Sequence, residues 1–209
     1  MKRAHAGVPL ANGTLGLLVW GSARELRVTI ARQGFWHHGG GNPVLSRTDF
    51  ATVRRLLEAN DAAGIEEVFG KHHGMWGQHP RQVGGGRLTV RLPAAWAWDE
   101  AWIQRDGSVR IRAAGPRHAT AVAVLRVAAD RELAWLDLPP ALSKVVKLSL
   151  DPAARLAGDA YETYGFPAPE SWSGRDRWGF LQRLPADPAL GVAVRRIGAT
   201  VQIATALGV

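Results

Sequence analysis

The chain has 209 residues, of which 26 are lysine or arginine and 18 are aspartate or glutamate, so its formal net charge is +8. An apolar fraction of 46% with 21% charged residues is typical of a folded globular protein and excludes a largely disordered chain. The absence of cysteine excludes disulfides, thiolate metal sites and thiol nucleophiles.

Targeting and surface charge narrow the class of protein further. No apolar run of about 18 residues exists, so we expect no transmembrane helix and no membrane partner. The basic start is followed by Val8-Pro9-Leu10-Ala11-Asn12-Gly13 rather than by an apolar stretch, so no signal peptide is predicted and the localisation stays open. The basic residues are mostly arginines in separated pairs, without a basic run or a basic helix, so we expect no nucleic-acid partner.

Alternation of polar and apolar residues is the dominant pattern along the chain, and it predicts strands. The first hairpin is expected to have strands over 15–20 and 25–30, with a turn at 21–24. Further strands are predicted over 87–92, 108–112, 120–127, 132–138, 145–150, 179–184, 192–196 and 200–206. About ten strands at this spacing, several of them in hairpins, predict an all-β sandwich or barrel.

A helical insert interrupts this β pattern between residues 39 and 86. Phe50, Val53, Leu56 and Leu57 share one face of a helix expected over 49–60, and a short second helix is expected over 64–69. We predict one domain over residues 1–209. The final strand, 200–209, has no capping element after it, which favours a fragment of a longer multidomain chain.

Histidines and tryptophans are the candidate binding residues. Adjacent histidines on a strand point to opposite faces, so the pairs His37-His38 and His72-His73 do not supply two ligands to one ion, and we predict no metal and no cofactor. These histidines suit a polar surface or a sugar-binding wall instead.

Tryptophan stacks on the apolar face of a pyranose ring, and this chain has nine of them. Core packing or an interface is the preferred interpretation for Trp96, Trp98 and Trp102, and a sugar-binding platform on one strand face is the alternative that makes them candidate substrate-binding residues. Trp36 and Trp76 lie beside the histidine pairs and join His37, His72 and His73 as candidate substrate-binding residues.

No catalytic residue can be nominated from the sequence. Acid–base hydrolysis needs two carboxylates that converge in a cleft. The carboxylates in charge-mixed loops are not framed by any motif; they are Asp99, Glu100, Asp159, Glu162, Glu170 and Asp176. Ser22 and Ser173 do not lie in the Gly-x-Ser-x-Gly pattern of a serine nucleophile.

The opening segment carries a resemblance. Pro9-Leu10-Ala11-Asn12-Gly13-Thr14-Leu15-Gly16, continued by Leu17-Leu18-Val19-Trp20-Gly21, resembles the opening of glycoside hydrolases that have an N-terminal β-supersandwich and an (α/α)6 barrel. The α-L-fucosidase family is the best known of these. Ala11 replaces their usual glycine. The segment from Leu26 to Trp36 resembles the strand that follows, and Gly86-Arg87-Leu88 and Gln182-Arg183-Leu184-Pro185 are weaker echoes.

The resemblance implies an all-β supersandwich with a short helical insert near residues 49–70. It implies a non-catalytic domain of a carbohydrate-active enzyme, because the general acid and base of these families lie in the barrel, which is the implied partner. A loop at Trp36-His37-His38, or the insert near His72-His73-Gly74-Met75-Trp76, is where we expect this domain to reach toward the substrate. The alternative function is a free-standing carbohydrate-binding module.

Overall fold

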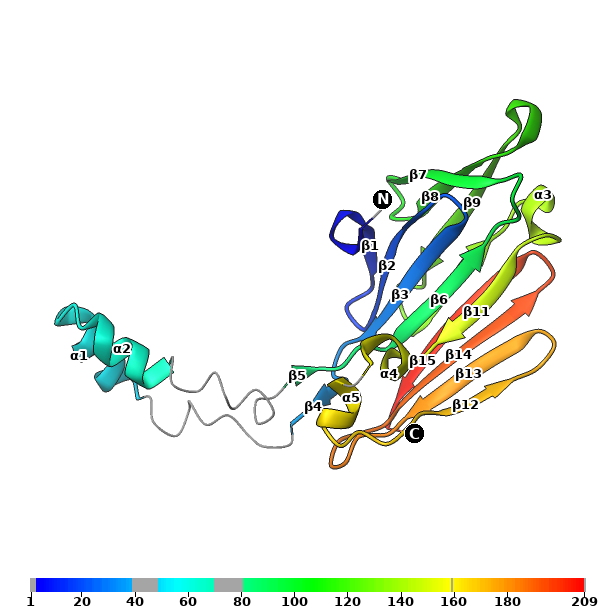
Figure 1. Cartoon of the computed structure of the whole chain (residues 1–209). Helices are drawn as coiled ribbons and strands as arrows, with labels where there is room; N and C mark the ends of the chain where they lie inside the picture. The colour runs from blue at the N-terminus through cyan, green and yellow to red at the C-terminus, as the bar shows by residue number, and fades with distance from the viewer. Residues whose placement is uncertain (1–2, 39–48, 70–80, 159, 209) are drawn as a thin grey trace.

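The chain folds as two antiparallel β-sheets packed face to face (Figure 1), seen in a computed structural model that describes residues 3–38, 49–69, 81–158 and 160–208. One sheet has five strands in the order β1 (Val8–Ala11), β2 (Leu15–Ser22), β3 (Glu25–Arg32), β6 (Gly86–Arg91) and β11 (Lys147–Asp151). The other has eight strands in the order β12 (Glu170–Ser173), β13 (Arg177–Gln182), β14 (Leu190–Ile197), β15 (Thr200–Leu207), β10 (Leu133–Asp137), β9 (Thr120–Val127), β8 (Val109–Ala114) and β7 (Ala97–Ile103). The predicted all-β sandwich is confirmed, as are its hairpins β2–β3, β9–β10 and β14–β15.

The helical insert is also confirmed. It contains α1 (Phe50–Glu58) and α2 (Ala62–Phe69), and the Asp49 carboxylate caps α1 by accepting a hydrogen bond of 2.7 Å from the Thr52 backbone N–H. Three single-turn helices, α3 (Pro140–Ser143), α4 (Ala153–Ala157) and α5 (Ala160–Thr163), were not predicted. They are too short to show an amphipathic period. None of the helices among the described residues is long and apolar enough to cross a membrane.

The core lies between the two sheets and follows the alternation of the strands. On β3, Leu26, Val28 and Ile30 are fully buried, while the residues between them are half-buried on the outer face. The same alternation recurs on β15, where Val201 and Ile203 face the core. Each fully buried aliphatic side chain contributes about 1.5–3 kcal/mol, so the pattern that predicts the strands also supplies the driving force for the sandwich.

Asn12 joins the two sheets at one end of the sandwich. It lies in the β1–β2 turn, where its Oδ1 accepts hydrogen bonds from the Thr14 and Leu15 backbone N–H groups at 3.0 and 2.8 Å. Its Nδ2 donates to the carbonyls of Ala128 and Arg131, at 2.7 and 2.9 Å, in the β9–β10 turn of the other sheet. One side chain therefore shapes its own turn and holds the opposite sheet.

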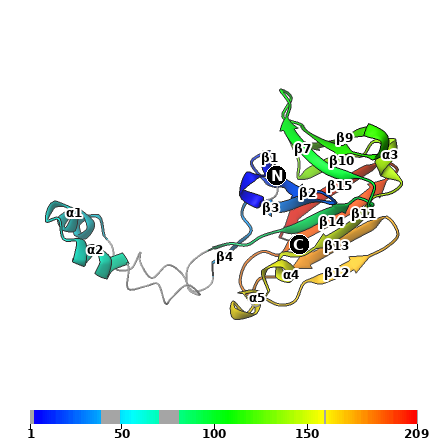
Figure 2. The ribbon, with the colours of Figure 1, turned by 45° about the horizontal axis from the view of Figure 1, so that its top comes forward.

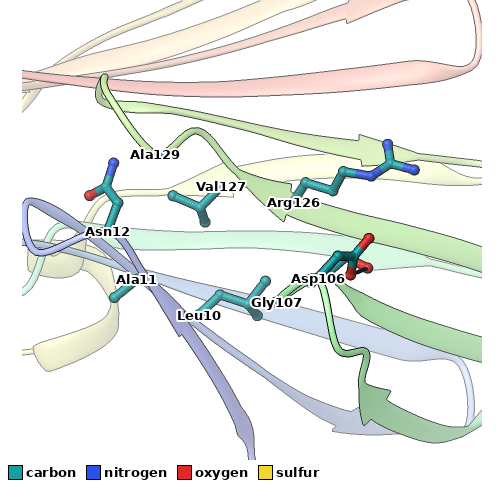
Figure 3. A pocket seen from close by; sticks show the side chains of 9 residues that line it. Leu10, Ala11, Asn12, Asp106, Gly107, Arg126, Val127 and Ala129 are labelled. Carbon is teal, nitrogen blue, oxygen red and sulfur yellow. Dashed lines mark hydrogen bonds between the residues drawn. The ribbon is translucent and has the colours of Figure 1, made fainter.

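A hollow of about 340 Å³ opens beside this contact (Figure 3). Asn12 lies on its wall near Val127 and Ala129, and Asp106 and Arg126 lie at the other end. The polar groups here already serve the fold: Asp106 accepts from Ser108, and Arg126 pairs with Asp137. We therefore treat the hollow as part of the junction between the sheets.

An ion pair strengthens the same junction. The Glu132 carboxylate, next to the β9–β10 turn, accepts from the Arg32 guanidinium of β3 at 2.8 and 2.6 Å and from the Thr205 hydroxyl of β15 at 2.7 Å. The hydrogen bond from Arg32 outweighs partial burial and, with the Thr205 hydroxyl, holds the pKa of Glu132 below its ordinary value. The side chains of Arg32 and Glu132 are only 15% and 25% exposed, so water screens this pair less than a surface pair.

Replacing Asn12 separates the two roles of its side chain. Asn12→Ala removes all four hydrogen bonds and leaves two carbonyls of the β9–β10 turn without this donor, so we expect a loss of about 2–3 kcal/mol in the free energy of unfolding. Asn12→Asp keeps the acceptor that shapes the turn but removes both donors, so it should lose stability as well. Urea unfolding at pH 7 measures both. A variant Asn12→Asp as stable as the wild type would show that the bonds between the sheets are unimportant.

Glu132→Gln is expected to make stability less dependent on pH. Because the pKa of Glu132 is lowered in the folded state, its contribution is present above the ordinary glutamate value of 4.5 and is lost as pH falls through the lowered value. We expect Glu132→Gln to unfold about 2 kcal/mol more easily at pH 7, with the difference shrinking toward pH 3. Asp130→Asn, which removes an exposed pair with Arg131, is the matched control and should change little. An equal loss for Glu132→Gln at both pH values contradicts the assignment.

Candidate functional site

The structure separates the predicted binding residues into different surroundings. Trp36 and His37 form β4 (Trp36–His37), which pairs with β5 (Arg81–Gln82). His72, His73 and Trp76 lie outside the described residues, so their predicted role remains a prediction. Trp96, Trp98 and Trp102 lie in and beside β7, on the edge of the eight-stranded sheet.

The three tryptophans near β7 do not share one exposed face, and core packing, the preferred interpretation, holds for Trp98. Trp98 is 2% exposed, and its indole N–H donates to the Val90 carbonyl at 3.2 Å, so it belongs to the core. Trp96 is half-buried with its ring against Gly115, where a β-carbon would lie 2.7 Å from the ring. A β-bulge between Trp98 and Glu100 shifts the alternation by one residue, which places Trp102 on the outer face. The sequence pattern did not reveal this bulge. Because of it, Trp98 and Trp102 lie on opposite faces of the strand.

The β4 turn, in contrast, meets a carboxylate that the sequence did not single out. The Asp187 carboxylate accepts from the His38 backbone N–H at 2.8 Å, and its other oxygen lies 2.6 Å from His38 Nδ1. His37 is buried, with its Nδ1 3.7 Å from Asp187 and without a hydrogen-bond partner among the described residues. Asp187 is 149 residues from His38 in sequence. We call Trp36, His37, His38 and Asp187 the β4 cluster.

The Asp187 carboxylate is charged although it is nearly covered, with 8% of its side chain exposed. Burial works to raise its pKa, but the two hydrogen bonds from His38 and the nearby charge of both imidazoles outweigh burial and hold the pKa below the ordinary aspartate value of 3.8. Asp187 is therefore ionised at neutral and mildly acidic pH. Its electrostatic contribution is present above 3.8 and is lost as pH falls through the lowered pKa.

Aromatic side chains from the segment around α5 pack against the β4 cluster. This segment lies beside β4 at one end of the sandwich (Figure 2). The ring of Phe166 meets the His37 ring edge-on at a centroid distance of 4.9 Å, and Tyr161 meets Phe166 at 5.1 Å. Burial raises the pKa of the Tyr161 hydroxyl to about 12, and this hydroxyl donates to the Gly84 carbonyl. The Arg81 guanidinium stacks 3.7 Å above the centre of the Tyr164 ring.

This arrangement suits the binding of a polar ligand that has an apolar face. Because Asp187 engages Nδ1, the His38 ring is held in one orientation with Nε2 as its other hydrogen-bonding atom, and 62% of the side chain is exposed. Trp36 is 37% exposed, with its ring 6.4 Å from that of His38. A hollow of about 420 Å³ lined by Arg183, Asp187 and Pro188 adjoins the cluster. An imidazole beside an indole presents hydrogen-bonding and stacking groups to the same ligand.

No group of three or more histidine or carboxylate side chains among the described residues is placed to hold a metal ion. A scan of the chain against protein-family models matches none of them, and a search of the curated proteins returns no match. The fold, the β4 cluster and the resemblance of the opening segment are therefore the observations that bear on function.

Asp187→Ala is expected to release the β4 turn. It removes one charge-assisted hydrogen bond to the His38 ring and one to its backbone N–H, so we expect a loss of about 2–3 kcal/mol in the free energy of unfolding and faster hydrogen exchange at the His38 amide. Asp187→Asn keeps an oxygen acceptor without the charge and should be intermediate. Glu58→Gln, in an exposed pair with Arg54, is the control. Unchanged stability and unchanged exchange in Asp187→Ala would show that Asp187 does not hold the β4 turn in place.

Proposed function

We propose that this chain is the N-terminal, non-catalytic β-sandwich of a glycoside hydrolase, and that it packs against an (α/α)6 catalytic barrel. The proposal rests on the structure of the segment that resembles the opening of such enzymes. That segment folds into β1, β2 and β3, the start of a two-sheet antiparallel sandwich, and ends in the turn that Asp187 holds at its surface. The resemblance and the fold are therefore consistent over the same residues.

The helical insert supplies a surface for the barrel. On α1, Leu56 is buried, while Phe50 and Leu57 are 82% and 62% exposed. These two residues are seven positions apart and therefore share one helix face. Large exposed apolar side chains grouped in this way are typical of an interaction surface. In our proposal this face packs against helices of the catalytic barrel.

Three of the carboxylates named in the sequence analysis are already engaged in ion pairs, which fits a non-catalytic role. Asp99 and Glu100 both pair with Arg112 at 3.1 Å on the exposed edge of the sheet. Glu170 pairs with Arg183 at 2.8 Å, also with both side chains exposed. Inverting hydrolysis needs an acid and a base about 6.5–9.5 Å apart with a water between them. In our proposal that pair comes from the barrel, and Trp36 and His38 contribute one wall of the substrate cleft.

A free-standing carbohydrate-binding module is the second candidate, and one observation favours it. Trp172 on the edge strand β12 is 48% exposed, and its ring lies against Gly179 of β13, where a β-carbon would lie 2.1 Å from the ring. An exposed indole on an open sheet face is a suitable platform for a pyranose ring. The sequence pattern did not single out Trp172 as such a platform.

Hydrolysis assays separate the two candidates. We expect the product of the complete gene to hydrolyse a nitrophenyl glycoside and residues 1–209 alone to show no turnover. In the complete product, Phe50→Glu with Leu57→Glu should lower kcat/KM at least tenfold, because two charges are placed in the proposed interface. Arg55→Glu, also on α1 but not on the apolar face, is the matched control and should retain activity.

Two outcomes contradict the proposal. Turnover by residues 1–209 alone would show that the chain is itself catalytic. Full activity in the double variant would show that this face of α1 does not contact the barrel. An inactive gene product that still binds glycans would favour the carbohydrate-binding module.

A further inference from the structure

Three arginines without a described ion-pair partner gather where β12 turns into β13. Arg175 lies in that turn, Arg177 begins β13, and Arg195 on β14 is the direct cross-strand partner of Arg177. All three are exposed, and none forms an ion pair with a carboxylate among the described residues. Like charges directly opposite on neighbouring strands are destabilising. The fold thus keeps an unfavourable pair at this position.

The arginines line one hollow of about 460 Å³, together with Gly174 and Asp176. The turn is fixed by a hydrogen bond from the Gly174 N–H to the Arg177 carbonyl and one from the Arg196 N–H to the Asp176 carbonyl, both 2.8 Å. A β-carbon on Gly174 would lie 3.3 Å from Arg177 Cγ and 3.4 Å from Nε, so the glycine leaves room for Arg177 to fold back over the turn. Three guanidinium groups and one carboxylate give the hollow a net positive charge.

The exposed indole of Trp172 lies beside this hollow. Trp172 is directly opposite Gly179, and Gly179 is two residues from Arg177, so Trp172 and Arg177 are diagonal neighbours on the same face of the sheet. Diagonal neighbours lie about 7–8 Å apart, within reach of aromatic and long side chains. An apolar platform and a cationic hollow are therefore available to one ligand.

We propose that Trp172 and the arginine-lined hollow form a binding site for an acidic sugar, a pyranose that carries a carboxylate. The apolar face of the ring stacks on the Trp172 indole, and the carboxylate accepts hydrogen bonds from Arg177 and Arg195. Guanidinium groups match the two oxygens of a carboxylate in geometry and charge. The choice of a sugar among the possible anions rests on the proposed carbohydrate function. The presence of a cationic hollow does not depend on that function.

The charge pattern favours a single acidic group over a polyanion. Two other arginines on the same sheet face are already neutralised: Arg126 pairs with Asp137, and Arg112 pairs with Asp99. Arg110 on β8 is exposed and forms no ion pair among the described residues, but β14, β15, β10 and β9 lie between it and β13. Beyond Trp172, Glu170 and Arg183 form another pair. A nucleic-acid strand is bound along a continuous cationic track, whereas the three arginines at the β12–β13 turn form a local group.

The site is distinct from the β4 cluster. Arg177 begins β13 and Gln182 ends it, which separates the two ends of the strand by about 17 Å at 3.3 Å per residue. Figure 1 shows β13 running from the β12–β13 turn toward the end where β4 and α5 lie. Binding at the hollow can therefore be measured on residues 1–209 without any barrel.

The test is a calorimetric titration of residues 1–209 with methyl α-galacturonide, which carries one carboxylate, with its methyl ester as the uncharged match. We expect the acid to bind and the ester to bind at least tenfold more weakly. Arg177→Gln, Arg195→Gln and Trp172→Leu should each weaken binding of the acid at least fivefold. Arg112→Gln, which removes an arginine already paired with Asp99, should not.

Thermal unfolding keeps this test independent of folding. Arg195→Gln removes one member of a like-charge pair, so the free variant should unfold at the same temperature as the wild type or a higher one. Weaker binding in that variant is then a property of the site.

Several outcomes overturn the proposal. Equal binding of the acid and its ester would show that the arginines do not recognise the carboxylate. Inorganic phosphate binding as tightly as the acid would show that the site does not recognise the sugar. An oligothymidylate that binds more tightly than the acid assigns the surface to nucleic acid, and no binding of the acid removes the site. Each of these results leaves the hydrolysis assays on the complete gene product unaffected, so the two proposals fail separately.

Discussion

The structure depends on the contacts that hold the two sheets together at the β1–β2 end. A sandwich buries one face of each sheet, but burial by itself is not directional and fixes no unique alignment of the sheets. Asn12 and the Arg32–Glu132 pair both reach from the five-stranded sheet to residues beside the β9–β10 turn. Hydrogen bonds have a defined geometry, so these contacts select one relative position of the sheets. The Asn12 turn therefore serves to align the two sheets.

The fixed sandwich leaves surfaces free for function at both ends of β13. At one end, Asp187 follows the strand and holds His38 beside Trp36, with Phe166 beneath His37. At the other, Arg177 and Arg195 meet beside Trp172. Both surfaces combine an exposed indole with groups that bind oxygen atoms. In our proposals, the first surface faces a catalytic cleft and the second binds an acidic sugar.

The strands were predictable because each has one buried face. The pattern of residues 25–30 and 120–127 repeats the period of a half-buried strand, and the structure has strands there. The edge strand β12 has no buried face and therefore no such pattern. The bulge after Trp98 is a local change in backbone register that residue types do not encode directly, so the sequence placed Trp98 and Trp102 on one strand face, whereas the structure has Trp98 in the core and Trp102 on the outer face. Asp187 was missed for a different reason: it meets His38 only through tertiary folding, and no local motif marks it apart from its position between Pro185 and Pro188.

The central claim is that this sandwich serves a catalytic barrel in the same polypeptide. The most direct measurement is the sequence of the reading frame downstream of the codon for Val209. The account predicts several hundred further residues with strong helical periodicity and a pair of carboxylates suited to acid–base hydrolysis. A stop codon directly after Val209 would contradict it, because the sandwich would then have no barrel to support.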